Sequence, residues 1–258
     1  IHKIHDFIPY EKDSNMVALI LMDMGLKVNK IPSISPLFTH NRTVIANSLV
    51  LSTPYHVDEY RHFQSTMLVN HALEYPHEAA FIMTDRYFQN NLETSKNTIG
   101  FYSHGSWIRK NQGRTASRIG NTEMEELLVQ YLYEYLSGKK HLTLKIYLHP
   151  MEKKETVFSQ TESYYKSMFR EANYEFANLN HKTTDIFETS DVAVGVISAI
   201  LFERLFCGFK TILFTRKNPE FPVIDSSLNN ICAADSPELF CLLDKTLNTE
   251  TQPFFKTM

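Results

Sequence analysis

Apolar and polar positions follow a regular pattern from about residue 97 to the end of the chain. Short apolar runs predict strands at residues 98–102, 142–148, 191–197, 211–214 and 230–233. Apolar residues spaced three or four positions apart predict helices at 122–136, 156–172, 198–207 and 236–247. Thr122 and Glu125 have the spacing of a capping box at the start of the first helix. Alternation of strands and helices through short connections predicts an α/β fold with a parallel sheet covered on both faces.

The pattern before residue 97 is less regular. It predicts a helix at 16–28, a short strand at 48–52, a helix at 58–73 and a strand at 79–83. Residues 89–97 are polar, contain three asparagines and predict a linker. We therefore expect two domains, 1–96 and 97–258.

Composition narrows the class of protein. With 258 residues, of which 43% are hydrophobic, the chain can bury one large core or two small ones. Lys and Arg number 26 against 29 Asp and Glu, so a nucleic-acid partner would need a local basic patch and is not expected. Apolar runs such as 197–202, which is interrupted only by Ser198, are much too short to span a membrane. The chain starts without Met or a signal-peptide pattern, which suggests that sequence upstream is missing.

Cysteine and histidine spacing gives no metal signature. The three cysteines lack a C-x-x-C pair, which argues against a disulfide framework and a zinc site. The eleven histidines form no H-E-x-x-H pair. We expect reduced thiols in a cytoplasmic protein, with no metal and no cofactor.

Three loops follow predicted strands and carry polar residues, at 103–109, 149–154 and 197–203. Ligands of parallel α/β sheets bind outside the carboxyl ends of the strands. In the last loop, Ser198 stands where a helix begins, so its hydroxyl and the first free amides favour an anion. Glu203, five residues later, can reach the hydroxyls of a ribose. The alternative is that Ser198 only caps the helix and Glu203 is solvated.

The other two loops carry further groups that can bind an anion. Pro150 ends a strand and presents His149, which can donate to a phosphate or carboxylate. Gly105 allows close approach of a ligand, Ser106 can bind phosphate, and Arg109 can pair with an anion. His149 could equally be a surface residue. The single tryptophan, Trp107, is expected to fill the core or a domain interface.

The stretch 184–213 resembles the donor-binding half of GT-B glycosyltransferases. It runs through Ser190-Asp191, an apolar strand, a serine turn, a helix with Glu203, and then a glycine before a strand. His149-Pro150 resembles the "HP" motif of bacterial sialyltransferases, polysialyltransferases and teichoic-acid polymerases. The resemblance covers residues 98–248 and departs from the family at Ala199, where a second Ser or Thr is usual.

This resemblance implies a GT-B-like fold of two Rossmann-like halves across a cleft, with a short or incomplete amino-terminal half. It implies a glycosyltransferase that moves an acidic sugar from a CMP donor onto a glycan or lipid-linked glycan in surface-polysaccharide synthesis. His149 and Ser198 would hold the donor phosphate. The transfer would invert the configuration of the sugar and would need no metal. The enzyme would work in the cytoplasm or at the inner face of the membrane, with peripheral membrane association.

In GT-B enzymes the catalytic base generally comes from the half opposite the donor, which places it before residue 97. Residues 54–59 are the only stretch there in which titratable groups directly follow a strand-like segment and a proline turn. We expect Asp58 to be the base, with His56 in reserve. The alternative is that Asp58 caps the helix that follows it.

Other functions stay open. A UDP-sugar glycosyltransferase or a sugar-nucleotide epimerase of the same architecture would have a similar carboxyl half, and a non-catalytic glycan-assembly module fits the weak amino-terminal half. Dinucleotide oxidoreduction is not favoured, because no G-x-G-x-x-G follows a strand. A serine hydrolase would need G-x-S-x-G, and residues 195–199 lack its second glycine.

Overall fold

The chain forms two compact units, Ile1–Arg86 and Tyr87–Met258, whereas the sequence placed the boundary between residues 96 and 97. A computed structural model describes residues 3–6, 12–30, 45–49, 68–69, 94, 96–113, 119–196, 198–215, 226–251 and 254. Among these, no helix is long and apolar enough to cross a membrane.

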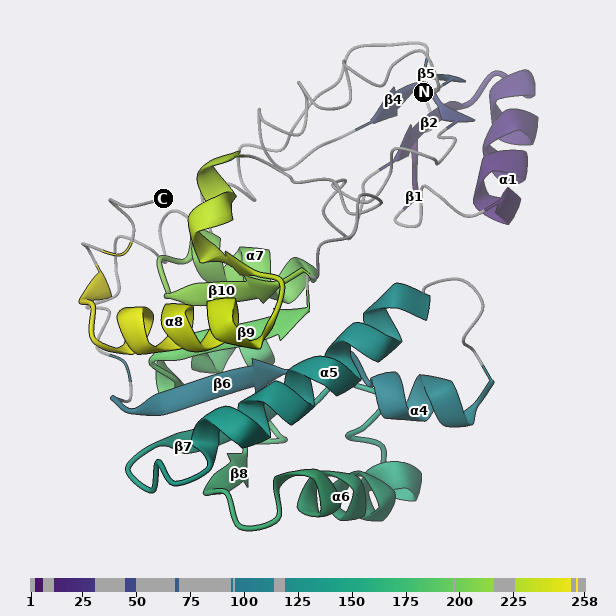
Figure 1. Ribbon diagram of the computed structural model, residues 1–258. Helices are drawn as coiled ribbons and strands as arrows, with labels where there is room; N and C mark the ends of the chain where they lie inside the picture. Colours follow the sequence, from purple (N-terminus) through teal and green to yellow (C-terminus); the bar gives the residue numbers. More distant parts are fainter. Residues whose placement is uncertain are drawn as a thin grey trace. The chain divides into compact units, whose positions relative to one another are not determined.

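In the described part of the first unit, short parallel strands lie beside a helix (Figure 1). Its described elements are β1 (Lys3–Asp6), α1 (Lys12–Asp23), β2 (Lys27–Lys30), β3 (Ile45–Ala46), β4 (Ser48–Leu49) and β5 (Leu68–Val69). The order in one sheet is β1-β2-β4, and β3 pairs with β5.

Two sequence predictions for this unit are wrong in part. The helix expected at 16–28 ends at Asp23, and Val28 is a buried residue of β2. Gly25, with φ of 78°, adopts the left-handed conformation that ends the helix between them. Leu68–Val69, expected in the helix at 58–73, forms strand β5. The strand expected at 79–83 lies outside the described residues.

The second unit is built on a sheet in which every pair of neighbouring strands is parallel. Its strands are β6 (Thr98–Tyr102), β7 (Thr143–Tyr147), β8 (Tyr174–Phe176), β9 (Val192–Val196), β10 (Thr211–Phe214) and β11 (Cys232–Ala233). Its α-helices are α4 (Ser106–Asn111), α5 (Ile119–Leu136), α6 (Glu155–Phe169), α7 (Ala199–Phe206) and α8 (Ser236–Leu247). Two 3-10 helices, η3 (Thr183–Thr189) and η4 (Ser226–Ile231), complete the described elements. This confirms the predicted α/β class.

The strand order is β11-β10-β9-β6-β7-β8. In chain order within the unit this is 6-5-4-1-2-3, the doubly wound order of dinucleotide-binding folds. The order reverses between β6 and β9, where Phe101 pairs with Val194. On the other side of β6, Tyr102 pairs with Tyr147 of β7. The carboxyl ends of β6, β7 and β9 therefore reach the same edge of the sheet.

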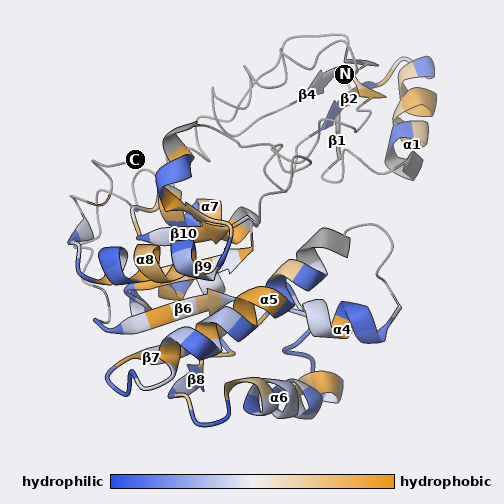
Figure 2. Ribbon diagram, viewed as in Figure 1, coloured by the Kyte–Doolittle hydropathy of each residue, from blue (hydrophilic) through white to orange (hydrophobic). Residues whose placement is uncertain are grey.

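The two faces of β9 explain why this strand is apolar throughout. Val192, Val194 and Val196 join the core cluster that contains residues of α5 and α8. The alternate residue Gly195 faces α7, since a Cβ there would lie 3.0 Å from Leu201 Cδ1. A strand buried on both faces is apolar along most of its length, and β9 carries mostly hydrophobic colours in Figure 2.

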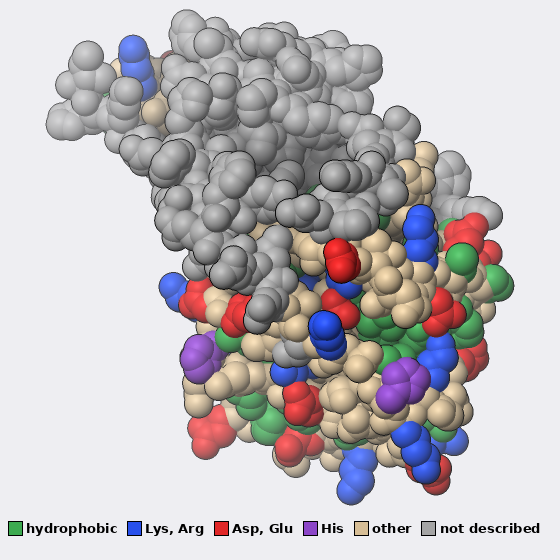
Figure 3. Space-filling model, turned by 90° about the vertical axis from the view of Figure 1, so that its left-hand side faces the viewer, with side chains coloured by type: hydrophobic (Ala, Val, Ile, Leu, Met, Phe, Trp, Pro, Cys, Tyr) green, Lys and Arg blue, Asp and Glu red, His purple; other side chains and the backbone are tan. Residues whose placement is uncertain are grey.

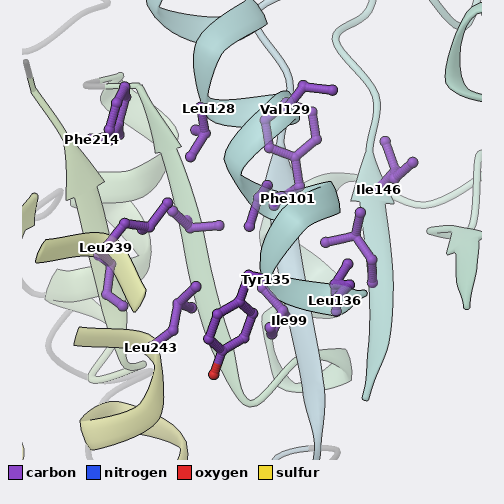
Figure 4. Packing of buried hydrophobic residues seen from close by; sticks show 14 of the residues in the cluster. Ile99, Phe101, Leu128, Val129, Tyr135, Leu136, Ile146, Phe214, Leu239 and Leu243 are labelled. Carbon is purple, nitrogen blue, oxygen red and sulfur yellow. The ribbon is translucent and has the colours of Figure 1, made fainter. Parts of the chain in front are cut away.

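Helices α5 and α8 cross the near face of the sheet in Figure 1 and share one core. Figure 4 shows Leu128 and Leu136 of α5 in the same cluster as Leu239 and Leu243 of α8, over Phe101 of β6. The helical periodicity predicted for 122–136 is confirmed by these contacts.

The predicted capping box of α5 is wrong. The helix begins at Ile119, so Thr122 lies inside it. The Glu125 carboxylate instead accepts hydrogen bonds from the loop that follows β6. The three-residue separation of Thr122 and Glu125 fits a capping box, but Glu125 contacts a segment that is distant in sequence.

Candidate functional site at the strand carboxyl ends

The three loops that the sequence singled out follow β6, β7 and β9 at the edge of the sheet where the strand order reverses. Ligands of doubly wound sheets bind at this point. The structure brings two of the loops into contact, because a Cβ on Gly105 would lie 3.4 Å from the Cβ of His149. Gly105 has φ of 67°, a left-handed conformation that suits glycine.

Ser198 occupies the N-cap position of α7, in extended backbone conformation, but its side chain makes no capping hydrogen bond. Its Oγ is buried and has no hydrogen-bond partner among the described residues. The interpretation of Ser198 as a plain helix cap therefore does not account for this hydroxyl. Ala199 opens the helix. A buried hydroxyl beside the amides of a helix N-terminus is suited to an anion.

His149 lies half-buried in the turn after β7. Its Nδ1 accepts a hydrogen bond from the Met151 amide at 3.2 Å. Burial, with smaller effects of the charges of Arg109 and His104, lowers the pKa of His149 to about 4. At neutral pH the ring is uncharged, and with Nδ1 accepting, its hydrogen is on Nε2. His149 is therefore a neutral donor, and the exposed Pro150 turns the chain beside it.

The segment predicted as a loop at 103–109 is a loop only as far as Gly105, because helix α4 begins at Ser106. The whole segment is tied to the interior. The Ser106 amide donates to Glu125 Oε1 at 3.1 Å, and the Ser106 side chain is buried, so the expected contact of Ser106 with phosphate stays a prediction. Arg109 is partly buried, and its Nε donates to the His104 carbonyl at 3.1 Å. The Arg109 guanidinium is thereby held close to the turn at Gly105.

Glu203 lies on α7, one and a half turns from Ser198, as the sequence predicted. Its side chain is partly exposed, and burial raises the pKa of its carboxyl group. A carboxyl group there can accept hydrogen bonds from hydroxyl groups of a ligand seated at the start of α7.

Sequence reasoning missed two buried carboxylates behind the loops, Glu125 and Glu152. Burial raises the pKa of Glu125 to about 7. Burial and the nearby charge of Glu125 raise the pKa of Glu152. Glu152 accepts a hydrogen bond from Trp107 Nε1 at 2.7 Å, and the Trp107 ring stacks on Tyr164. The only signal in the sequence was the position of Glu152, three residues after His149 in the predicted loop at 149–154.

Asp58 and His56, the expected catalytic base and its reserve, lie outside the described residues, and their role stays a prediction. Among the described residues, no group of three or more His, Cys, Asp or Glu side chains could hold a metal ion. On the face seen in Figure 3, basic and acidic side chains of the described residues are intermixed.

A family model with the description "putative O-antigen biosynthesis protein" matches residues 87–238, which is more than half of the chain. A search of curated proteins finds no match.

Solved structures of similar fold come from several bacteria. A putative UDP-N-acetylglucosamine 2-epimerase of Listeria monocytogenes has a TM-score of 0.54 at 11% identity, covering 99% of this chain and 67% of its own. HepE of Anabaena, in complex with UDP and glucose, has a TM-score of 0.51 at 9% identity, covering 96% and 69%. The pneumococcal O-GlcNAc transferase GtfA, in complex with UDP and GlcNAc, has a TM-score of 0.50 at 8% identity, covering 93% and 50%.

At these identities the likeness concerns the fold. The chain has a GT-B-like α/β fold, as the sequence resemblance implied. It spans half the length of the pneumococcal transferase.

Proposed function

Because the chain belongs to this O-antigen biosynthesis family, we propose that it is a glycosyltransferase that uses a nucleotide-sugar donor in surface-polysaccharide synthesis. The acceptor would be a glycan or a lipid-linked glycan. The observation that carries the proposal is the buried Ser198 hydroxyl, which has no partner among the described residues, at the start of α7 and beside the reversal of strand order.

The donor phosphate is the group that these residues suit. Ser198 Oγ–H, the first amides of α7 and His149 Nε2–H are all donors. His149 reaches the phosphate as an uncharged donor at neutral pH, because its pKa is lowered to about 4. Transfer releases a phosphate with added negative charge, and fixed donors stabilise that charge as it develops. Glu203 and Arg109 complete the site by contact with the ribose and with the anion.

We propose that the nucleobase of the sugar donor is a pyrimidine. The resemblance of His149-Pro150 to the HP motif favours CMP carrying an acidic sugar. HepE and GtfA hold UDP, which favours a UDP-sugar. Isothermal titration calorimetry with CMP, UDP and GDP separates these donors. We expect CMP or UDP to bind at least about tenfold more tightly than GDP. Failure of both pyrimidine nucleotides to bind would refute the proposal.

Two substitutions test the phosphate ligands. Ser198→Ala and His149→Ala should each weaken nucleotide binding by about 1–3 kcal/mol, since each removes a donor in a partly buried site. Ser167→Ala and His141→Ala, at exposed positions, are the matched controls and should bind as the wild type does. Unchanged affinity in either test variant removes that residue from the site.

Catalysis is tested separately from binding. The acceptor hydroxyl must lose its proton as it attacks, which a carboxylate within hydrogen-bond reach accomplishes. We propose Asp58 as this base, with His56 in reserve, in an inverting reaction that needs no metal. Asp58→Asn should abolish most transfer and leave nucleotide affinity nearly intact. A variant that retains most of its turnover would place the base elsewhere.

A sugar-nucleotide epimerase is the second candidate, favoured by the fold shared with the Listeria protein. Incubation with the donor alone distinguishes the candidates. A glycosyltransferase hydrolyses the donor slowly to free sugar and nucleotide, an epimerase forms the epimeric nucleotide sugar, and a non-catalytic module leaves the donor unchanged.

A further inference from the structure

Glu152 lies behind the candidate site with its side chain completely buried. Its Oε1 accepts hydrogen bonds from Trp107 Nε1 at 2.7 Å and from the Tyr165 hydroxyl at 3.0 Å. Its Oε2 accepts from the His149 amide at 2.8 Å. A buried carboxylate is tolerated only when such donors replace water. Glu152 therefore depends on all three elements that supply them.

These donors come from separate parts of the unit. Trp107 belongs to α4, which follows β6, whereas His149 lies in the turn after β7 and Tyr165 lies on α6. One carboxylate thus connects the loops of two neighbouring strands at the edge where the strand order reverses.

Glu152 also shapes the turn that carries the imidazole. Its own amide donates to the His149 carbonyl at 2.8 Å, and its carboxylate accepts from the His149 amide, so the turn is closed from both directions. Within this turn the Met151 amide donates to Nδ1 of the ring. The ring is therefore held in the form that carries its hydrogen on Nε2.

The second buried carboxylate fixes the neighbouring loop. Glu125 accepts hydrogen bonds from the amides of His104 and Ser106 and from the Ser103 hydroxyl. Between the two anchors, the backbone of Gly105 lies beside His149, because a Cβ added at Gly105 would lie 3.5 Å from Cγ of the ring.

We propose that Glu152 is a positioning residue, which couples α4 to the turn after β7 and thereby holds His149 in the orientation that donates to the donor phosphate. The role in donor binding rests on the proposed function. The coupling itself concerns this chain's own residues and is measurable without a nucleotide.

Glu152→Gln is the test substitution because it keeps the size of the side chain and removes one acceptor. With the amide oxygen at the Oε1 position, the amide NH2 faces the His149 N–H. In the opposite orientation it faces the Trp107 indole N–H. In either case one loop loses its acceptor. Glu175→Gln, the same change at an exposed position on β8, is the control.

The nucleotide-free measurement uses NMR. Trp107 is the only tryptophan, so its indole N–H gives one assignable signal, and the 15N shifts of His149 report the tautomer. We expect the indole signal, the imidazole signals or both to move in Glu152→Gln and neither to move in Glu175→Gln. Signals that stay in place in both variants overturn the coupling. If Glu152→Gln does not fold, Trp107→Phe is the second variant, because it removes the indole donor. It is expected to move the imidazole signals of His149, and signals that stay in place overturn the coupling.

The binding measurement uses calorimetry with UDP and CMP. Glu152→Gln should weaken binding about tenfold, as loss of an aligned hydrogen bond does, and Glu175→Gln should leave it within about twofold. In the His149→Ala background, Glu152→Gln should cause little further loss, because Glu152 acts through His149. Multiplied losses in the double variant would refute the positioning role. If the wild type binds neither nucleotide, the proposed function fails, and the NMR measurement still decides the coupling.

Discussion

Substitution of Glu125 by Gln should remove a pH dependence from the stability of the second unit. Burial raises the pKa of Glu125 from 4.5 to about 7, although the hydrogen bonds from His104, Ser106 and Ser103 act in the opposite direction. In the unfolded chain this carboxyl group returns to its ordinary pKa. Between the two values the folded protein binds more protons than the unfolded chain, so stability falls as pH rises.

The size of this effect follows from the two pKa values. The interval from 4.5 to about 7, at roughly 1.4 kcal/mol per pH unit, corresponds to about 3 kcal/mol. This stability is fully present below pH 4.5 and is lost as pH rises through about 7. Gln does not ionise, so the variant lacks this loss. It also gives up one of the loop's hydrogen bonds, which lowers its stability by about 1 kcal/mol at all pH values.

Urea unfolding at pH 5 and pH 8, followed by Trp107 fluorescence, measures the effect in this unit, because Trp107 is the only tryptophan. The free energy of unfolding of the wild type, minus that of Glu125→Gln, should fall by about 2–3 kcal/mol from pH 5 to pH 8. Glu123→Gln, at an exposed position of the same helix, should keep the wild-type pH dependence. If the difference in the free energy of unfolding between the wild type and Glu125→Gln does not change with pH, the reasoning is refuted.

Three further substitutions test how the second unit is held together. In Gly100→Ala the new Cβ would lie 2.6 Å from Ser190 Oγ, so urea unfolding should show a loss of about 1–3 kcal/mol, and a loss below about 0.5 kcal/mol would contradict the packing. Lys210→Met leaves the buried Asp191, whose Oδ1 lies 2.7 Å from Lys210 Nζ, without its counter-charge, and we expect a loss of unfolding free energy of about 3–5 kcal/mol. Adding Asp191→Leu should recover part of this stability, and no recovery would contradict the pairing. Asp235→Ala removes the cap of α8 and should cost about 1 kcal/mol by thermal unfolding, whereas an unchanged midpoint would mean that the cap contributes nothing.

The sheet of the second unit could be predicted because its signal is local. The runs at 98–102 and 211–214 coincide with β6 and β10, since a strand buried on both faces is apolar along most of its length. The three-residue strand β8 was missed, because none of its residues is fully buried and its apolar pattern is short. The positions of two candidate ligand-binding residues, Ser198 and His149, directly after their strands were also predicted from the local pattern.

The local pattern could not predict hydrogen-bond partners that are distant in sequence. Glu125 fits a capping box, and only the fold shows that its carboxylate binds the loop at 103–106. Glu152 has the appearance of a surface charge, and only the fold buries it beneath Trp107 and His149. Hydrophobic periodicity therefore determined most strands and helices of the second unit, though not β8 or α4, and it determined that the sheet is parallel. The tertiary structure alone decided which polar groups are buried and paired, because desolvation and hydrogen bonding depend on neighbours that the sequence does not place side by side.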